Sequence, residues 1–163
     1  MPVHLTDAQI ASLLEEAKPL EADYRRLLGT RPKRGHKERD LDIEGASGGA
    51  FRLILRQSDI NPLDFSVILT YLIPRSNHTF RLRRYNGRSH RHTNKIERQT
   101  FYDFHIHMAT ERYQERDGFD EDDYAEPTGR FSTFEEALKC MLNDCGFKVP
   151  RDSSPQLPLF GEP

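Results

Sequence analysis

The chain has 163 residues, of which 36% are hydrophobic and 31% are charged, and its formal net charge is −2. This length suits one domain with a buried core and a short appendage. No apolar run approaches the roughly 20 residues that span a bilayer, and "MPVHLTDAQ" lacks the pattern of a signal peptide. Cys140 and Cys145 suit neither a Cys-x-x-Cys site nor a disulfide framework. We therefore expect a cytoplasmic protein with reduced thiols and no membrane contact.

The charge is distributed unevenly along the chain. Residues 25–98 contain 17 Lys or Arg and 7 Asp or Glu, whereas residues 99–163 contain 6 and 14. A basic middle segment is typical of a surface that faces nucleic acid or phosphate. The acidic segments can also neutralise it across the fold. The sequence leaves both interpretations open.

The first 29 residues predict a helix with a break. Thr6 and Gln9 form a predicted capping box at its start. Apolar residues then recur at helical spacing from Ile10 as far as Leu28. Pro19 lies inside this stripe and predicts a kink or a junction between two helices. The basic, turn-rich segment "TRPKRGHKERD" that follows is predicted to be a loop.

Four strand candidates follow the loop. "AFRLILRQ" and "TFRLRRY" alternate apolar residues with arginines, and "DFSVILTYLI" is apolar almost throughout, as in a central strand. "TFYDFHIHMATERYQ" predicts a strand with one apolar face and one polar face. The alternation places the following residues on one common sheet face: Arg52, Arg56, Arg81, Arg83, His105 and His107.

The last predicted element is a helix that begins with a Ser132/Glu135 capping box and ends at Gly146. Together the elements predict an α+β fold: an antiparallel meander of about four to five strands with the N- and C-terminal helices on one face. Residues 1–150 form one predicted domain, and residues 151–163 an extended tail.

Two pairs of histidines are the candidate functional residues. His105 and His107 are predicted about 6–7 Å apart on one strand face, and His90 and His92 lie in the preceding loop. These four imidazoles can hold zinc, iron or manganese if the fold brings them together. The polar face can also be purely structural, with cross-strand charge pairs.

The same strand face suggests a second chemistry. His105 and His107 can act as acid and base near neutral pH while Arg83 holds a phosphate and Glu111 assists, as a metal-independent ribonuclease requires. Nucleic acid would then contact the arginines of the basic middle segment, namely Arg52, Arg56, Arg81, Arg83, Arg88 and Arg91.

The segments "NPLDFSVIL", "FRLRRYNG" and "FYDFHIHMATERYQ" resemble an uncharacterised bacterial α+β domain family over about residues 45–147. That resemblance implies no established activity. The chain is also loosely similar to small toxin components of bacterial toxin–antitoxin pairs, which carry histidine-rich strands. This similarity implies a toxin or defence role and assigns no catalytic motif residue by residue.

The tail contains Gln156-Leu157-Pro158-Leu159-Phe160, which resembles the bacterial sliding-clamp-binding motif Gln-Leu-x-Leu-Phe. In that family Gln anchors one end of the peptide, and the Leu-Phe pair fills an apolar pocket. The resemblance implies a bacterial accessory protein that docks on the DNA sliding clamp and acts in replication, repair, or mobile-element or defence biology. This function requires no cofactor. The alternatives are the ribonuclease, a histidine-rich metal-binding module, and a tail that folds back on its own domain.

The clamp interpretation predicts that a peptide of residues 151–163 binds the purified clamp with micromolar affinity, since an extended peptide loses little entropy and has apolar anchors. Changing Leu159→Ala together with Phe160→Ala should abolish binding, measured by fluorescence anisotropy. Binding that survives the double substitution would contradict the motif assignment.

Overall fold

The computed structural model describes residues 3–29 and 31–150. Its helices are α1 (Asp7–Glu15), α2 (Tyr24–Leu27), α3 (Glu111–Gln114) and α4 (Phe134–Asp144). Its strands are β1 (Lys18–Pro19), β2 (Arg31–Lys33), β3 (His36–Glu44), β4 (Ala50–Ser58), β5 (Phe65–Leu72), β6 (Thr79–Asn86), β7 (His92–Asn94), β8 (Gln99–Phe101), β9 (His105–Met108), β10 (Ala125–Pro127) and β11 (Phe147–Lys148). None of the helices in these ranges is long and apolar enough to cross a bilayer.

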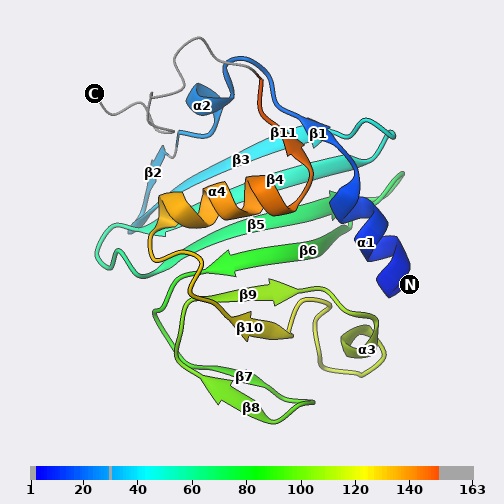
Figure 1. Cartoon of the computed structure of the whole chain (residues 1–163), viewed down its shortest axis with the longest axis vertical. Helices are drawn as coiled ribbons and strands as arrows, with labels where there is room; N and C mark the ends of the chain where they lie inside the picture. The colour runs from blue at the N-terminus through cyan, green and yellow to red at the C-terminus, as the bar shows by residue number, and fades with distance from the viewer. Residues whose placement is uncertain (1–2, 30, 151–163) are drawn as a thin grey trace.

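The main sheet has the strand order β10-β9-β6-β5-β4-β3-β2, and every neighbouring pair is antiparallel (Figure 1). The predicted α+β class is confirmed, but the sheet in the described residues is larger than four to five strands. Two of the additional strands, β2 and β3, come from the segment predicted as a basic loop. Only Ile43 of β3 is buried in the core. The other residues of this strand need not be apolar, so the sequence lacks the alternation that identifies a strand.

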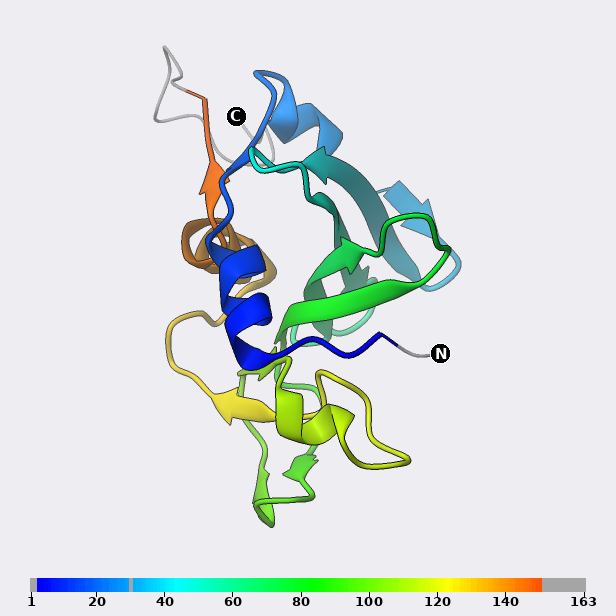
Figure 2. The same cartoon turned by 90° about the vertical axis from the view of Figure 1, so that its right-hand side faces the viewer.

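Helices α1 and α4 both lie on one face of this sheet (Figure 2). Ala137, Leu138 and Met141 of α4 are fully buried, and the helix packs on β5 and β6. The Thr6/Gln9 capping box is confirmed. The box predicted at α4 is displaced by one residue, because Thr133 is the N-cap and its side chain accepts from the backbone N–H of Glu136.

The predicted break at Pro19 is present, and a helix lies on each side of it, but the residues between Glu15 and Tyr24 are not helical. The chain forms the short strand β1 at Pro19, which pairs with β11 in parallel, and only then the single turn of α2. The prediction for residues 101–113 is right only in its middle, since β9 covers four residues and Glu111 begins a helix.

A β-bulge on β6 changes which arginines share a face. The pairing between β5 and β6 shifts at Leu69/Thr70, so β6 contains one extra residue there. Arg81 and Arg84 consequently both contact Asp122, although they are three residues apart. Arg83 instead lies on the helix face, where it donates to Tyr85 Oη at 3.4 Å.

A buried lysine joins the ends of the two main helices. Lys18 is 0% exposed, and its Nζ donates to the carbonyl oxygens of Leu13, Leu14, Glu16 and Cys145 at 2.7–3.2 Å. These carbonyls end α1 and α4, where helix dipoles favour a cation. Burial lowers the pKa of Lys18 to about 8, so the ammonium group is still mostly protonated at pH 7.

Replacing Lys18→Met should lower the free energy of unfolding by about 3 kcal/mol or more, because the carbonyls of two helix ends lose their donor. Urea denaturation of the whole chain measures this change. The control is Lys139→Met, since that side chain is exposed and its ion pair with Glu135 at 3.6 Å is weak. Equal stability of the two variants would show that the lysine junction contributes little.

Candidate metal centre

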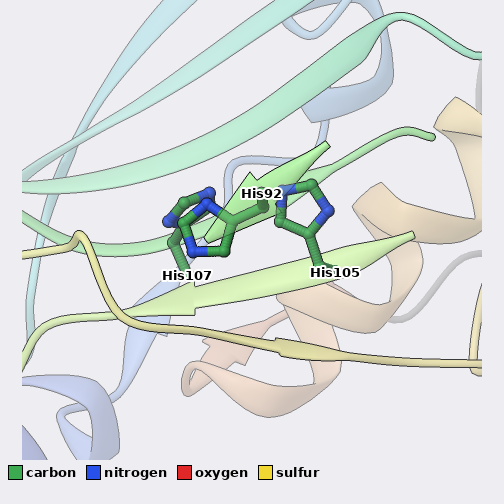
Figure 3. Close-up of side chains that lie close together, drawn as sticks. All are labelled: His92, His105 and His107. Atoms are coloured by element: carbon green, nitrogen blue, oxygen red, sulfur yellow. The ribbon is translucent and has the colours of Figure 1, made fainter. Parts of the chain in front are cut away.

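Two elements bring three histidines together on the sheet face opposite α4. His105 and His107 alternate on β9 with Ile106, which faces the core, so both imidazoles point to the other side. The β7–β8 hairpin places His92 against them (Figure 3). The ring centroids are 4.8–5.4 Å apart. His105 and His107 are almost fully buried, whereas His92 is half-buried.

One ring nitrogen from each histidine lies within 4.8 Å of the other two. Hydrogen bonds define which nitrogen is free on β9. His105 Nδ1 lies 2.7 Å from the carbonyl oxygen of Asp103, and His107 Nδ1 lies 2.7 Å from that of Asp122. A carbonyl oxygen only accepts, so each Nδ1 carries the proton and each Nε2 keeps its lone pair.

Asn94 orients the third imidazole in the same way. Its amide donates to the carbonyl oxygen of Ala125 at 2.7 Å, and its Oδ1 accepts from the Ala125 N–H at 2.9 Å. This double contact fixes Oδ1 as an acceptor, and His92 Nε2 lies 2.8 Å from it. His92 Nε2 therefore donates, and Nδ1 keeps the lone pair. Such outer hydrogen bonds are typical of metal-binding histidines.

Burial keeps the β9 histidines neutral. It lowers the pKa of His105 to about 4 and the pKa of His107 to about 2. The positive charge of Arg84, which pairs with His107 across β6 and β9, lowers both pKa values further. A metal binds the neutral form of imidazole. These two ligands are thus ready for a cation at pH 7 without losing a proton.

Acidic residues balance the arginines beside the site. Asp122 is 0% exposed, and its two carboxylate oxygens lie 3.2 Å from Arg81 Nε and Arg84 Nε. Asp120 and Glu121 also contact Arg81, at 3.4 and 3.8 Å. Burial raises the pKa of Asp122, and both arginines oppose that shift. Three carboxylates therefore lie around the two guanidinium groups beside the site.

The structure does not bring the other predicted site residues into this cluster. His90 is exposed, and its Nδ1 lies 3.1 Å from Ser89 Oγ. Glu111 accepts from the Asp7 N–H at 3.0 Å, at the start of α1. It belongs with His4 and Glu115 to a separate group at that end of the molecule. Arg83 lies on the helix face, so the histidines lack both of their predicted ribonuclease partners.

The arginines predicted to contact nucleic acid fall into two sets. On the sheet, three have acidic partners: Arg52 contacts Asp42 at 2.7 Å, Arg56 contacts Glu38 at 3.4 Å, and Arg81 is surrounded as described above. The fourth, Arg83, donates to Tyr85 Oη on the helix face. Arg88 and Arg91 lie outside the sheet and are exposed. Neutralisation across the sheet therefore comes mostly from β3 and the acidic loop before β10.

Sequence reasoning missed Asn94 and Arg84. The spacing of His92 and Asn94 places both on one side of a strand and was the available indication for Asn94. The alternation in the sequence did not place Arg84 on the histidine face, because the bulge on β6 shifts that alternation by one residue. The tail residues Gln156, Leu157, Leu159 and Phe160 lie outside the described residues, and their binding to a clamp stays a prediction.

The buried histidines predict a pH dependence of stability in metal-free protein. The unfolded chain binds protons near pH 6.5, whereas folded His105 does so only near pH 4. The free energy of unfolding therefore has its full value above pH 6.5 and falls as the pH drops toward 4, by up to about 1.4 kcal/mol per pH unit for each such histidine.

His105→Gln should reduce this slope in urea denaturation with EDTA between pH 6.5 and 4.5. His78→Gln, at an exposed position, should leave it unchanged, and equal slopes in all three proteins would refute the prediction.

No protein-family model, no curated protein and no solved structure matches the chain.

Proposed function

We propose that this domain binds a divalent transition metal, zinc above all, through His92 Nδ1, His105 Nε2 and His107 Nε2. The observation that carries the proposal is that one ring nitrogen of each histidine lies within 4.8 Å of the other two, while a protein acceptor holds the other nitrogen, which leaves His92 Nδ1, His105 Nε2 and His107 Nε2 without a proton. Imidazole ligands suit zinc, copper, iron and nickel. Magnesium and calcium prefer oxygen ligands, which this cluster lacks.

The dimensions of the cluster fit such an ion after a small adjustment. Zinc binds imidazole nitrogen at about 2.0–2.1 Å, which places the nitrogens of a tetrahedral site roughly 3.4 Å apart. The spacing of up to 4.8 Å therefore requires each ring to move inward by less than about 1 Å. His92 lies on a small hairpin, and its movement disturbs the sheet least.

Three protein ligands leave a coordination position for water. Catalytic zinc sites have this arrangement, whereas structural sites usually have four protein ligands. A pocket of about 210 Å³, lined by His92, Thr93, Lys95, Tyr113 and Asp123, lies beside the hairpin histidine. Zinc lowers the pKa of its bound water to about 7 and polarises substrate oxygens. A zinc ion held by His92, His105 and His107 would therefore supply the chemistry of a hydrolytic enzyme.

The same geometry disfavours the metal-independent ribonuclease. A general acid must be protonated at working pH, and the pKa values of about 4 and about 2 leave His105 and His107 neutral at pH 7. The phosphate-holding role of Arg83 is disfavoured as well, because that side chain lies on the opposite sheet face. Metal binding uses the neutral imidazoles that acid catalysis cannot use.

The test is zinc binding by the untagged whole chain. Metal content after purification and titration against a chromophoric chelator should give about one zinc per chain, and cobalt should give the intense visible absorption of a tetrahedral site. His107→Ala and His92→Ala should each weaken affinity by roughly 100-fold or more, since loss of even an outer hydrogen bond to a ligand costs 10–100-fold.

The matched control is His90→Ala, because His90 was predicted as a ligand from sequence but lies outside the cluster. It should retain wild-type affinity. Circular dichroism of each variant separates a lost ligand from a lost fold. Absence of stoichiometric zinc, or equal losses in His90→Ala and His107→Ala, would refute the assignment.

A further inference from the structure

The β7–β8 hairpin and the turn before it form a ribbon of residues 88–101 that extends beyond the main sheet in both views (Figures 1 and 2). This ribbon is rich in exposed cations. Its basic residues are Arg88, Arg91, Lys95 and Arg98, and all four are exposed. Its only acidic residue is Glu97.

The ribbon cations are not neutralised as the sheet arginines are. Among the described residues, no carboxylate lies within ion-pair distance of any of the four. Glu97 is held elsewhere, by Arg112 at 2.6 Å and by Tyr113 Oη at 2.7 Å. The ribbon therefore presents exposed cations without an ion pair among the described residues, with Lys95 Nζ over the Phe119 ring at 5.8 Å, whereas the sheet arginines form pairs within the fold.

Protein contacts hold the ribbon in place. Asn94 bonds both backbone groups of Ala125 in β10, and the Phe101 ring packs against His92 and His105 with centroids 5.4 and 5.6 Å apart. A surface that is already ordered loses little entropy when it binds.

An exposed aromatic ring lies at the base of the ribbon. Tyr102 is 48% exposed, and the guanidinium group of Arg88 lies over its ring at 5.5 Å. Arginine beside an exposed aromatic is a combination that contacts phosphates and stacks on bases. The ribbon has no exposed aliphatic side chain for insertion into a membrane, since Ile96 is half-buried.

We propose that the 88–101 ribbon binds the phosphodiester backbone of nucleic acid. A two-stranded β-ribbon fits the major groove of duplex DNA, and cations beside an exposed tyrosine also suit a single strand. Duplex and single-stranded nucleic acids share the anionic backbone, which is the group that the ribbon would recognise. The ribbon is anchored by protein contacts, so the proposal does not rest on metal binding, and the interaction should persist in EDTA.

The experiment is fluorescence anisotropy of the whole chain with a labelled 20-base-pair DNA duplex and with a labelled 20-nucleotide RNA, in EDTA and with zinc. We expect binding that weakens with salt. Replacing all four ribbon cations with Gln should weaken it at least about tenfold and reduce the slope of log affinity against log salt by about 3, since each phosphate contact adds about 0.7–0.9. The relative affinities identify which nucleic acid is preferred.

A control variant carries the same loss of charge at exposed cations elsewhere: Arg34→Gln, Lys37→Gln, Arg75→Gln and Lys139→Gln. It should retain most of the affinity. A second ribbon variant, Arg91→Gln with Arg98→Gln, removes only side chains without a described contact, so a folding defect cannot explain its loss. No binding by the wild type, equal losses in ribbon and control variants, or binding to anionic lipid vesicles alone would each overturn the proposal.

Discussion

The candidate site depends on one constraint: each imidazole must have a single protonated nitrogen in a fixed place. A neutral imidazole can exchange its tautomer or rotate its ring unless an acceptor selects one orientation. Here two backbone carbonyls, of Asp103 and Asp122, and the side-chain oxygen of Asn94 make that selection. Because the carbonyls belong to the main chain, conformations of the loop before β9 and of the loop before β10 determine the direction of the lone pairs.

Burial strengthens this constraint for the two histidines of β9. Because His105 and His107 stay neutral at pH 7, each presents a lone pair rather than a second proton, and one ring nitrogen of each lies within 4.8 Å of one of His92. The surrounding charges agree with this arrangement, since Asp122 offsets the arginine next to His107. A cation between the three rings would meet the lone pairs of three ring nitrogens.

The parts of this structure that could be predicted from sequence are those governed by local alternation and capping. The capping box at Thr6, the central strand β5 and the common face of His105 and His107 all follow from residue spacing. The failures have non-local causes. β3 is a polar strand that pairs through its backbone with β4, and the bulge on β6 reverses the alternation that had placed Arg83 beside the histidines.

The sequence also could not show which of His90 and His92 joins the cluster, again for a non-local reason. Both lie in one turn-rich segment, and their spacing gives no reason to separate them. The structure separates them through Asn94, which anchors the hairpin to Ala125 and therefore turns His92 inward. Tertiary anchoring of a short hairpin leaves no periodic pattern in the sequence.

This anchoring also explains how one hairpin can serve two surfaces. Residues alternate along β7, so His92 and Asn94 face the cluster while Thr93 faces away and meets Thr100 at 3.0 Å. Metal and nucleic acid would thus contact different sides of the same two strands. The fields of exposed charges are screened over about 8–10 Å, so a metal ion inside the cluster would add to phosphate attraction without replacing the ribbon cations. Its larger effect would be to fix the hairpin on β9, and with it the direction in which the ribbon presents its charge.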